Sequence, residues 1–296
     1  MFDGIAYHLG VPAHAIAKDI LIVGDPDRAK AIADEHLESL EAQGEHRGLV
    51  TRTGIARSTG RRLTITTSGM GTGSAEIVLN ELVALHELDP NTGIRRAQVE
   101  PLTIIRVGTS GALHRETALG SAVISSAAVG LDSTGWFYDT PLTAEERKLA
   151  DLARARMEEG LLQGHPGQGL VRPYAAIASP EVVSALRDSA VKCGMSAEVG
   201  VTVTAAGFFA GQGRDVSRVP PLFRDLDRLL AREPRFRNFE MEASILLRLC
   251  RALGYRAGAI CVAAANREQG TFCPDIATAM DGVVRAAIQA FASVER

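Results

Sequence analysis

Strand-like and helix-like segments alternate along this chain, and the alternation limits the possible folds more than any other feature of the sequence. Short apolar runs, such as residues 20–23 and 102–107, are followed by segments with helical periodicity, such as residues 75–86. This pattern is typical of helices layered on a largely buried sheet. Because no repeat, low-complexity tract or linker interrupts residues 1–296, we expect a single α/β domain.

The same patterns predict the individual elements. The expected strands are residues 20–23, 63–67, 102–107, 122–129, 199–206 and 257–265. The expected helices are residues 26–36, 75–86, 142–160, 180–193, 220–231, 241–253 and 276–291. Residues 69–73 and 108–111 are expected to be glycine turns, residues 87–100 an extended surface loop, and residues 220–231 a charged flap.

Composition excludes several classes of function. The 32 basic and 35 acidic residues give a net charge of −3, so no basic excess indicates binding to nucleic acid or to an anionic membrane. The four cysteines form no C-x-x-C pair and are typical of reduced thiols in the cytoplasm. No secretory signal is apparent, and the apolar runs are too short to span a bilayer. We therefore expect a soluble cytoplasmic protein.

Two arginines follow or precede glycine-containing turns at predicted strand ends. Arg28 comes after the turn 24–27, and Arg106 comes directly before residues 107–111. Ligands of α/β sheets bind beyond the carboxyl ends of strands, and a guanidinium group matches phosphate with two hydrogen bonds. A single arginine in this position is most simply interpreted as an ion-paired surface residue. Two arginines beside glycine turns at strand ends favour the interpretation that they bind an anion.

The glycine-rich segment 69–74 invites comparison with a dinucleotide-binding loop. Its third glycine position is Ser74, and no acidic residue follows in a suitable strand, so a tight turn is at least as good an interpretation. The sequence contains no H-E-x-x-H motif, clustered Cys/His set, G-x-S-x-G motif or Walker A loop. Metal-dependent and covalent mechanisms thereby lose most of their support, and we expect no metal site.

Two later segments carry polar residues suited to a small heteroaromatic ligand. Gln212 and Arg214 would point the same way in an extended segment, and an amide with a guanidinium can bind the edge of a flat ring. Glu240 and Glu242 flank Met241 at the start of an apolar helix. Either carboxylate could cap that helix, but capping does not explain both.

These segments together resemble the nucleoside phosphorylase superfamily, and within it the uridine phosphorylases. The resemblance rests on seven motifs in order: Y-H-L-G at 7–10, G-D-P-D-R at 24–28, H-R at 46–47, R-V-G-T-S-G at 106–111, F-F-A-G-Q-G-R at 208–214, N-F-E-M-E at 238–242 and N-R at 266–267. They cover nearly the whole chain. The resemblance implies a mixed, twisted and partly barrel-like central sheet flanked by helices.

The resemblance also implies a role for each matched residue. Phosphate would be held by Gly24, Arg28, Arg106 and Thr109, with Arg47 from a neighbouring subunit. The ribose would be bound by Glu242, Met241 and Glu240, with His8 from the neighbour. The base would be bound by Phe208, Gln212, Arg214 and Arg267, and the catalytic residues would be Arg106, Arg214 and Glu242. Such sharing implies a homodimer or a hexamer built as a trimer of dimers.

The expected reaction is phosphorolysis of uridine to uracil and ribose 1-phosphate, a step of nucleoside catabolism and pyrimidine salvage, with inorganic phosphate as co-substrate and no cofactor. Asn266 stands where purine-specific relatives carry an aspartate, which favours a pyrimidine. Gly48 replaces an acid that helps relatives hold a monovalent cation, and Ala264 and Ala265 replace bulkier residues near the base. These differences leave the cation site and the breadth of base selectivity open.

Other functions remain open from the sequence alone. A purine nucleoside or 5′-methylthioadenosine phosphorylase or nucleosidase would use a similar fold. A non-catalytic nucleoside-binding protein would share the pocket but would lack a catalytic group. An NAD-dependent oxidoreductase would depend on residues 69–74 alone.

Overall fold

The computed structural model describes residues 4–294, which form a mixed α/β fold. The strands are β1 (Asp19–Val23), β2 (Leu37–His46), β3 (Leu49–Ala56), β4 (Arg62–Thr67), β5 (Thr103–Ala112), β6 (Ala122–Gly130), β7 (Tyr174–Ile177), β8 (Ala197–Thr204), β9 (Phe236–Glu240), β10 (Arg256–Asn266) and β11 (Thr271–Phe272). The helices are α1 (Pro26–His36), α2 (Thr72–Glu87), α3 (Ala144–Glu158), α4 (Pro180–Lys192), α5 (Leu226–Ala231), α6 (Ala243–Ala252) and α7 (Ile276–Ser293). Short 3-10 turns lie at Ala13–Ala15 (η1), Thr134–Phe137 (η2) and Ala210–Gln212 (η3).

All strands belong to one sheet with the order β11-β10-β6-β8-β9-β5-β1-β4-β3-β2, and β7 pairs with β6. An additional parallel pairing of β10 with β5 joins β10, β6, β8, β9 and β5 into a closed ring. The expected mixed and partly barrel-like sheet is therefore confirmed. Closure removes the edges of these five strands, and the open part of the sheet continues through β1, β4, β3 and β2.

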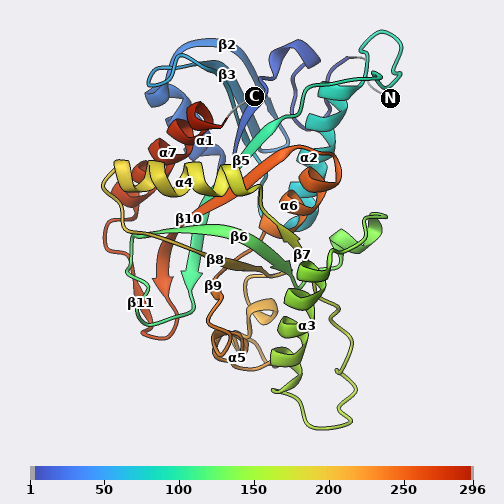
Figure 1. The fold of residues 1–296 in the computed structure, drawn as a ribbon, viewed down its shortest axis with the longest axis vertical. Helices are drawn as coiled ribbons and strands as arrows, with labels where there is room; N and C mark the ends of the chain where they lie inside the picture. The colour runs from blue at the N-terminus through green and yellow to red at the C-terminus, as the bar shows by residue number, and fades with distance from the viewer. Residues whose placement is uncertain (1–3, 295–296) are drawn as a thin grey trace.

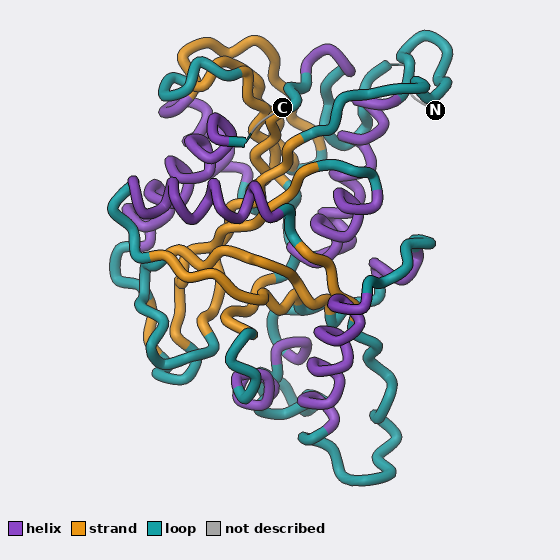
Figure 2. Tube along the Cα trace, viewed as in Figure 1, coloured by secondary structure: helices purple, strands orange, loops and turns teal. Residues whose placement is uncertain are grey.

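Helices cover the sheet from two sides (Figure 1). One apolar cluster packs α1, α4 and α7 against the sheet, and a second packs α2 and α6 against its other face. A third cluster, which includes residues of α3 and α5, covers the far side of the barrel strands. Figure 2 shows the same layers, with the barrel strands between the helices and the long loop after α3 extending away from them.

The strongly periodic helices lie where the sequence predicts them, but the strands β2, β3, β7, β9 and β11 were not predicted. The hairpin of β2 and β3 was missed because most of β2 is exposed and polar. β7 and β9 are only four and five residues long. The helix expected over residues 220–231 is shorter, because Asp225 adopts a left-handed conformation (φ 52°) directly before α5. Residues 87–100 form the expected polar loop.

The predicted turn at residues 108–111 is wrong, because β5 continues through these residues to Ala112. The glycines serve close packing instead of a reversal of the chain. A β-carbon at Gly108 would lie 2.3 Å from the guanidinium of Arg106, and one at Gly111 would lie 2.3 Å from that of Arg267. Both arginine side chains therefore lie directly over the strand.

No helix within residues 4–294 is both long and apolar enough to cross a membrane.

Candidate active site

A cavity of about 590 Å³ opens at the carboxyl ends of β1, β4 and β5, beside the start of α6. This is the edge at which α/β sheets bind ligands. Most of the residues expected from the sequence line it: Gly24, Arg28, Arg106, Thr109, Phe208, Gln212, Arg214, Glu240, Met241, Glu242 and Arg267. Segments that are as much as 243 positions apart in the chain, counted from 24 to 267, thus converge on one cavity. His8 and Arg47 do not line it.

One end of the cavity is suited to an oxyanion. Gly24 and Arg28 lie where β1 passes into α1, whose first turn is capped by Asp25 through a 2.7 Å hydrogen bond from the Arg28 N–H. Burial lowers the pKa of Arg28, and the nearby positive charge of Arg106 acts in the same direction, although Asp25 opposes both. Two guanidinium groups close enough to repel each other would be stabilised by a bound anion.

Arg106 projects from the middle of β5 and is buried. It forms an ion pair with Glu242, a second with Glu240 at 3.3 Å, and a hydrogen bond to the Sγ of Cys261 at 3.3 Å. Burial acts against the charge of Arg106, but the two carboxylates outweigh it and raise its pKa above the ordinary value. The guanidinium therefore stays charged and joins the anion end of the cavity to the glutamates.

The two glutamates have different partners. Both oxygens of Glu240 accept backbone N–H groups, from Glu242 at 2.8 Å and from Ala243 at 2.9 and 3.0 Å, so its carboxylate caps the start of α6. Thr204 also donates its hydroxyl to Glu240. Burial, in spite of Arg106, raises the pKa of the Glu240 carboxyl. Glu242 instead accepts from Arg106 and from the N–H of Gly71 at 2.7 Å. Glu242 is thus the carboxylate with capacity for a ligand.

The other end of the cavity is aromatic and carries amide and guanidinium groups. The Arg214 guanidinium lies 3.9 Å from the ring centroid of Phe208, and that of Arg267 lies 5.0 Å from the ring centroid of Phe239. Arg267 donates to the side-chain oxygen of Gln212. Burial without an ion pair, together with Arg214, lowers the pKa of Arg267 to about 10. Planar rings and directional donors at this end suit a heteroaromatic base.

Gln212 and Arg214 share this end for a reason other than the one expected. Residues 210–212 form the 3-10 turn η3, so the two side chains do not lie on one face of an extended segment. Gly213 then reverses the chain with φ 77°. A β-carbon at that glycine would lie 2.8 Å from the backbone nitrogen of Leu226, so the turn also packs closely against α5.

Asn266 lies at the end of β10 but does not line the cavity. Its side-chain amide donates to the carbonyls of His114 and Thr117 at 2.9 and 3.0 Å, and its oxygen accepts the Gln269 N–H. The residue therefore ties the end of β10 to the loop between β5 and β6. It does not present a proton donor to a ligand.

His8 and Arg47 lie outside the cavity in different settings. The ring of His8 is 2.7 Å from Glu81 of α2, which also accepts the backbone N–H groups of His8 and Leu9. Arg47 sits at the tip of the β2–β3 hairpin with φ 50° and is exposed. Neither side chain reaches the cavity of its own chain.

The loop between β4 and α2 has a structural use. Gly71 precedes α2 with φ 89° and points its N–H at Glu242, and the Ser74 hydroxyl donates back to the Ser68 carbonyl. Met70 of this loop lines the cavity and is 82% exposed. Phe272 of β11 also lines the cavity and is 77% exposed. These apolar residues at the cavity mouth were not predicted, because single exposed apolar residues carry no motif.

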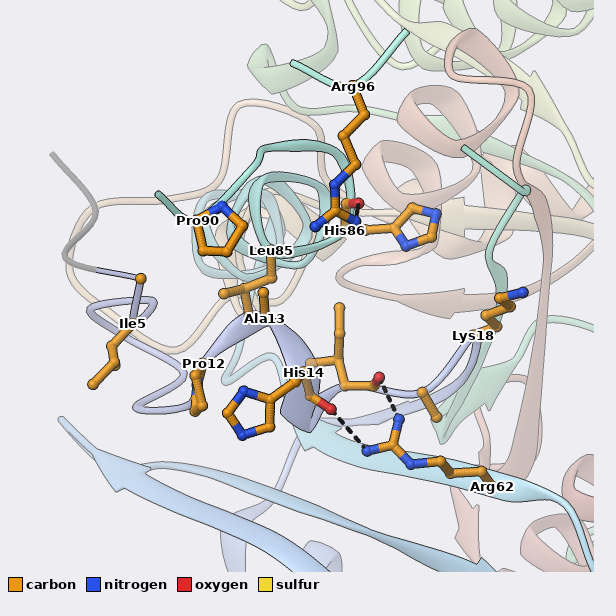
Figure 3. Close-up of a pocket in the computed structure, with 13 residues that line it drawn as sticks. Ile5, Pro12, Ala13, His14, Lys18, Arg62, Leu85, His86, Pro90 and Arg96 are labelled. Atoms are coloured by element: carbon orange, nitrogen blue, oxygen red, sulfur yellow. Dashed lines mark hydrogen bonds between the residues drawn. The ribbon is translucent and has the colours of Figure 1, made fainter. Parts of the chain in front are cut away.

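A second cavity lies at the opposite end of α2, between η1 and the 87–100 loop (Figure 3). Its cationic side chains already have partners. Arg62 donates to the carbonyls of Ile16 at 2.7 Å and His14 at 3.0 Å, Lys18 pairs with Glu100, and Arg96 donates to the His86 carbonyl. Arg62, Lys18 and Arg96 are therefore engaged with groups of the protein itself.

The comparisons with known proteins agree with this geometry. The family model of the phosphorylase superfamily matches residues 18–293. The chain is 30% identical to a uridine phosphorylase of Thermococcus kodakarensis, over 91% of this chain and 80% of the relative. It is 27% identical to the uridine phosphorylase of Escherichia coli K12, over 89% and 87%. A crystal structure of a Trypanosoma brucei nucleoside phosphorylase, described as showing uridine phosphorylase activity, superposes with a TM-score of 0.88 at 26% identity, covering 99% and 98%.

A closed five-stranded ring with an arginine-rich cavity at its strand ends defines a nucleoside phosphorylase-like enzyme. The chain belongs to the phosphorylase superfamily.

Proposed function

We propose that this protein is a pentosyltransferase that cleaves uridine with inorganic phosphate, giving uracil and ribose 1-phosphate. The observation that carries the proposal is the arrangement of charged and amide side chains in one cavity. Arg28 and Arg106 lie close enough to interact electrostatically, Arg106 pairs with Glu242, and Arg267 donates to Gln212, all within the lining of one cavity. The relatives named uridine phosphorylases match this chain over most of its length.

This arrangement supports a direct displacement. The phosphate dianion, held by the arginines and by Gly24 and Thr109, would attack the anomeric carbon as the N-glycosidic bond breaks. The transition state has oxocarbenium character, as in glycoside hydrolysis. Glu242 would accept hydrogen bonds from the ribose hydroxyls, while Met241 packs against the sugar. No covalent bond to the protein forms, and the cavity offers no nucleophile activated by a base.

The base leaves with the electron pair of the N-glycosidic bond, so negative charge develops on the ring nitrogen and on the carbonyl oxygens of uracil. Arg214 and the pair of Gln212 and Arg267 would donate to those oxygens, and Phe208 would pack on the ring. Preorganised donors aimed at developing charge are worth roughly 3–4 kcal/mol each. Burial and the charge of Arg214 lower the pKa of Arg267 in spite of Asp227, so a developing anion would stabilise its charge.

The complete site in this proposal is shared between two subunits of a homodimer or of a hexamer of three such dimers. Arg47 of one subunit would add to the phosphate end and His8 to the ribose end of its neighbour. The exposure of Arg47 at a hairpin tip supports this. We further propose that the enzyme works in the cytoplasm in nucleoside catabolism and pyrimidine salvage, with phosphate as co-substrate and no cofactor.

The test is to incubate the protein with uridine, with and without phosphate, and to measure uracil and ribose 1-phosphate. We expect release of uracil only with phosphate. Equal release in both reactions would indicate a hydrolase. Faster turnover of inosine or 5′-methylthioadenosine than of uridine would replace the proposal with a purine-directed enzyme. Binding of uridine without turnover would indicate a binding protein.

A further inference from the structure

A buried carboxylate, that of Asp132, lies outside the lining of the cavity. Asp132 follows β6 and is 6% exposed. Its oxygens accept hydrogen bonds from the Tyr174 hydroxyl at 2.9 and 3.0 Å, from the Ser244 hydroxyl at 3.1 Å and from the Thr134 N–H at 2.7 Å. A buried carboxylate is costly unless donors of this kind surround it.

The surroundings of Asp132 are closely packed. A β-carbon at either Gly130 or Gly135 would lie 2.5 Å from the ring of Tyr174, so the ring is held between two glycine backbones. Burial raises the pKa of Tyr174 well above its usual value, and the charge of Asp132 acts in the same direction. Tyr174 therefore remains a hydroxyl donor to Asp132.

One route leads from Asp132 to the helix that follows Glu242. Ser244, which donates its hydroxyl to Asp132, lies in the first turn of α6, two residues after Glu242. The backbone N–H of Ser244 donates to the Thr204 hydroxyl at 3.0 Å, and Thr204 in turn donates to Glu240. Asp132 is thus bonded to the same helical turn that Glu240 caps.

A second route leads from Asp132 to the other side of Glu242. Thr134, whose N–H binds Asp132, places its hydroxyl 2.9 Å from the hydroxyl of Thr72, the first residue of α2. The preceding residue, Gly71, donates its N–H to Glu242 at 2.7 Å. Asp132 therefore connects the starts of α2 and α6, the two elements between which the Glu242 carboxylate is held.

We propose that Asp132 is a positioning residue that sets the place of the Glu242 carboxylate for the ribose. The inference rests on the proposed function, because it assigns Glu242 to the ribose hydroxyls. Asp132 does not line the cavity and touches no substrate. It acts by holding Thr134 and Ser244, so its removal should disturb handling of the nucleoside and not that of phosphate, which binds at Gly24 and Arg28.

The experiment measures steady-state phosphorolysis of uridine by Asp132→Asn and Thr134→Val, with both substrates varied. We expect kcat/KM for uridine to fall by about tenfold in each variant, while KM for phosphate stays within about twofold of wild type. Asp132→Asn keeps the shape of the side chain, and Thr134→Val leaves the carboxylate and its other partners intact. An unchanged kcat/KM for uridine, or a rise of more than about twofold in the KM for phosphate, would overturn the proposal.

A double-mutant cycle with Glu242→Gln separates positioning from general loss of stability. If Asp132 acts through Glu242, Asp132→Asn should cost less than about twofold in the Glu242→Gln background. A full tenfold loss there would contradict the proposal.

As a matched control, Tyr255→Phe removes another buried tyrosine–carboxylate contact, to Glu87 at the far end of α2. We expect Tyr255→Phe to lower the melting temperature without changing KM, and Tyr174→Phe to change the KM for uridine.

The wild-type enzyme distinguishes the two proposals. If wild type releases no uracil from uridine and phosphate, the proposed function fails. If wild type is active and Asp132→Asn behaves like it, only the positioning role fails.

Discussion

Gly108 lies directly beneath the guanidinium of Arg106, the residue two positions before it on the same face of β5. A β-carbon at position 108 would be 2.3 Å from the Arg106 Nη1. Side chains two apart on a strand share a face, so only a residue without a side chain lets the arginine fold over the strand toward the glutamates. The glycine thereby sets the direction of the arginine.

This relationship predicts that Gly108→Ala displaces Arg106. We expect kcat/KM to fall at least about 100-fold, approaching the effect of losing an oriented donor. The measurement is steady-state phosphorolysis with both substrates varied. Gly73→Ala is the matched control, since a β-carbon there meets nothing within 4 Å. Equal activity of the two variants would show that Arg106 does not need this space.

Arg106→Ala removes the cation that pairs with two buried carboxylates and that we propose to bind phosphate. We expect a loss of several kcal/mol of transition-state stabilisation in kcat/KM. Stability should also fall, by about 3–5 kcal/mol, because Glu240 and Glu242 lose their cation. Chemical denaturation measures the second effect. Unchanged turnover at saturating phosphate would remove Arg106 from the phosphate site.

The two glutamates should respond differently to the same substitution. Glu242→Gln should raise the KM for uridine, or lower kcat. Because Arg106 keeps its ion pair with Glu240, the loss of stability should stay below that of Arg106→Ala. Glu240→Gln weakens the cap of α6 and should lower the free energy of unfolding by about 1–3 kcal/mol. Kinetics and urea denaturation of both variants test this contrast. A Glu242→Gln enzyme with wild-type kinetics would refute its ribose role.

Arg267→Met should weaken the base end of the cavity. The variant keeps an unbranched apolar stem over Phe239 but cannot donate to Gln212 or to a uracil oxygen. We expect kcat/KM for uridine to fall by a factor that corresponds to a loss of about 3 kcal/mol in transition-state stabilisation. The KM for phosphate should stay unchanged. Loss of phosphate affinity instead would show that the assignment of the two ends is reversed.

A shared site predicts complementation between inactive subunits. Arg47→Ala and Arg106→Ala subunits are each expected to form defective sites, but a mixed dimer would contain one site with both arginines. After unfolding and refolding the two variants together, we expect about one quarter of wild-type activity, because half of the dimers are mixed and each has one intact site. No recovery, with dimers present on a sizing column, would refute sharing through Arg47.

Much of the fold and of the site followed from local signals. Amphipathic helices such as α4 and α7 bury one face, so their periodicity is written in the sequence. The ordered motifs supply most of the residues that line the cavity, but Met70 and Phe272 lie outside them. The edge hairpin was missed because β2 pairs mainly through its backbone and exposes most of its side chains. Short strands such as β9 form only because neighbouring strands accept their hydrogen bonds.

By itself, the sequence determined the α/β class, the order of the motifs and the arginines, glutamates and glutamine of the site, because these depend on residue type and spacing. Only the tertiary structure decided that β10 pairs with β5 to close the ring, that β5 runs on past Arg106, and that Glu240 caps α6 while Glu242 faces Gly71. The physical reason is that each of these outcomes depends on partners far away in the chain. Two glutamates of identical chemistry, two residues apart, acquire different roles only when distant segments pack around them.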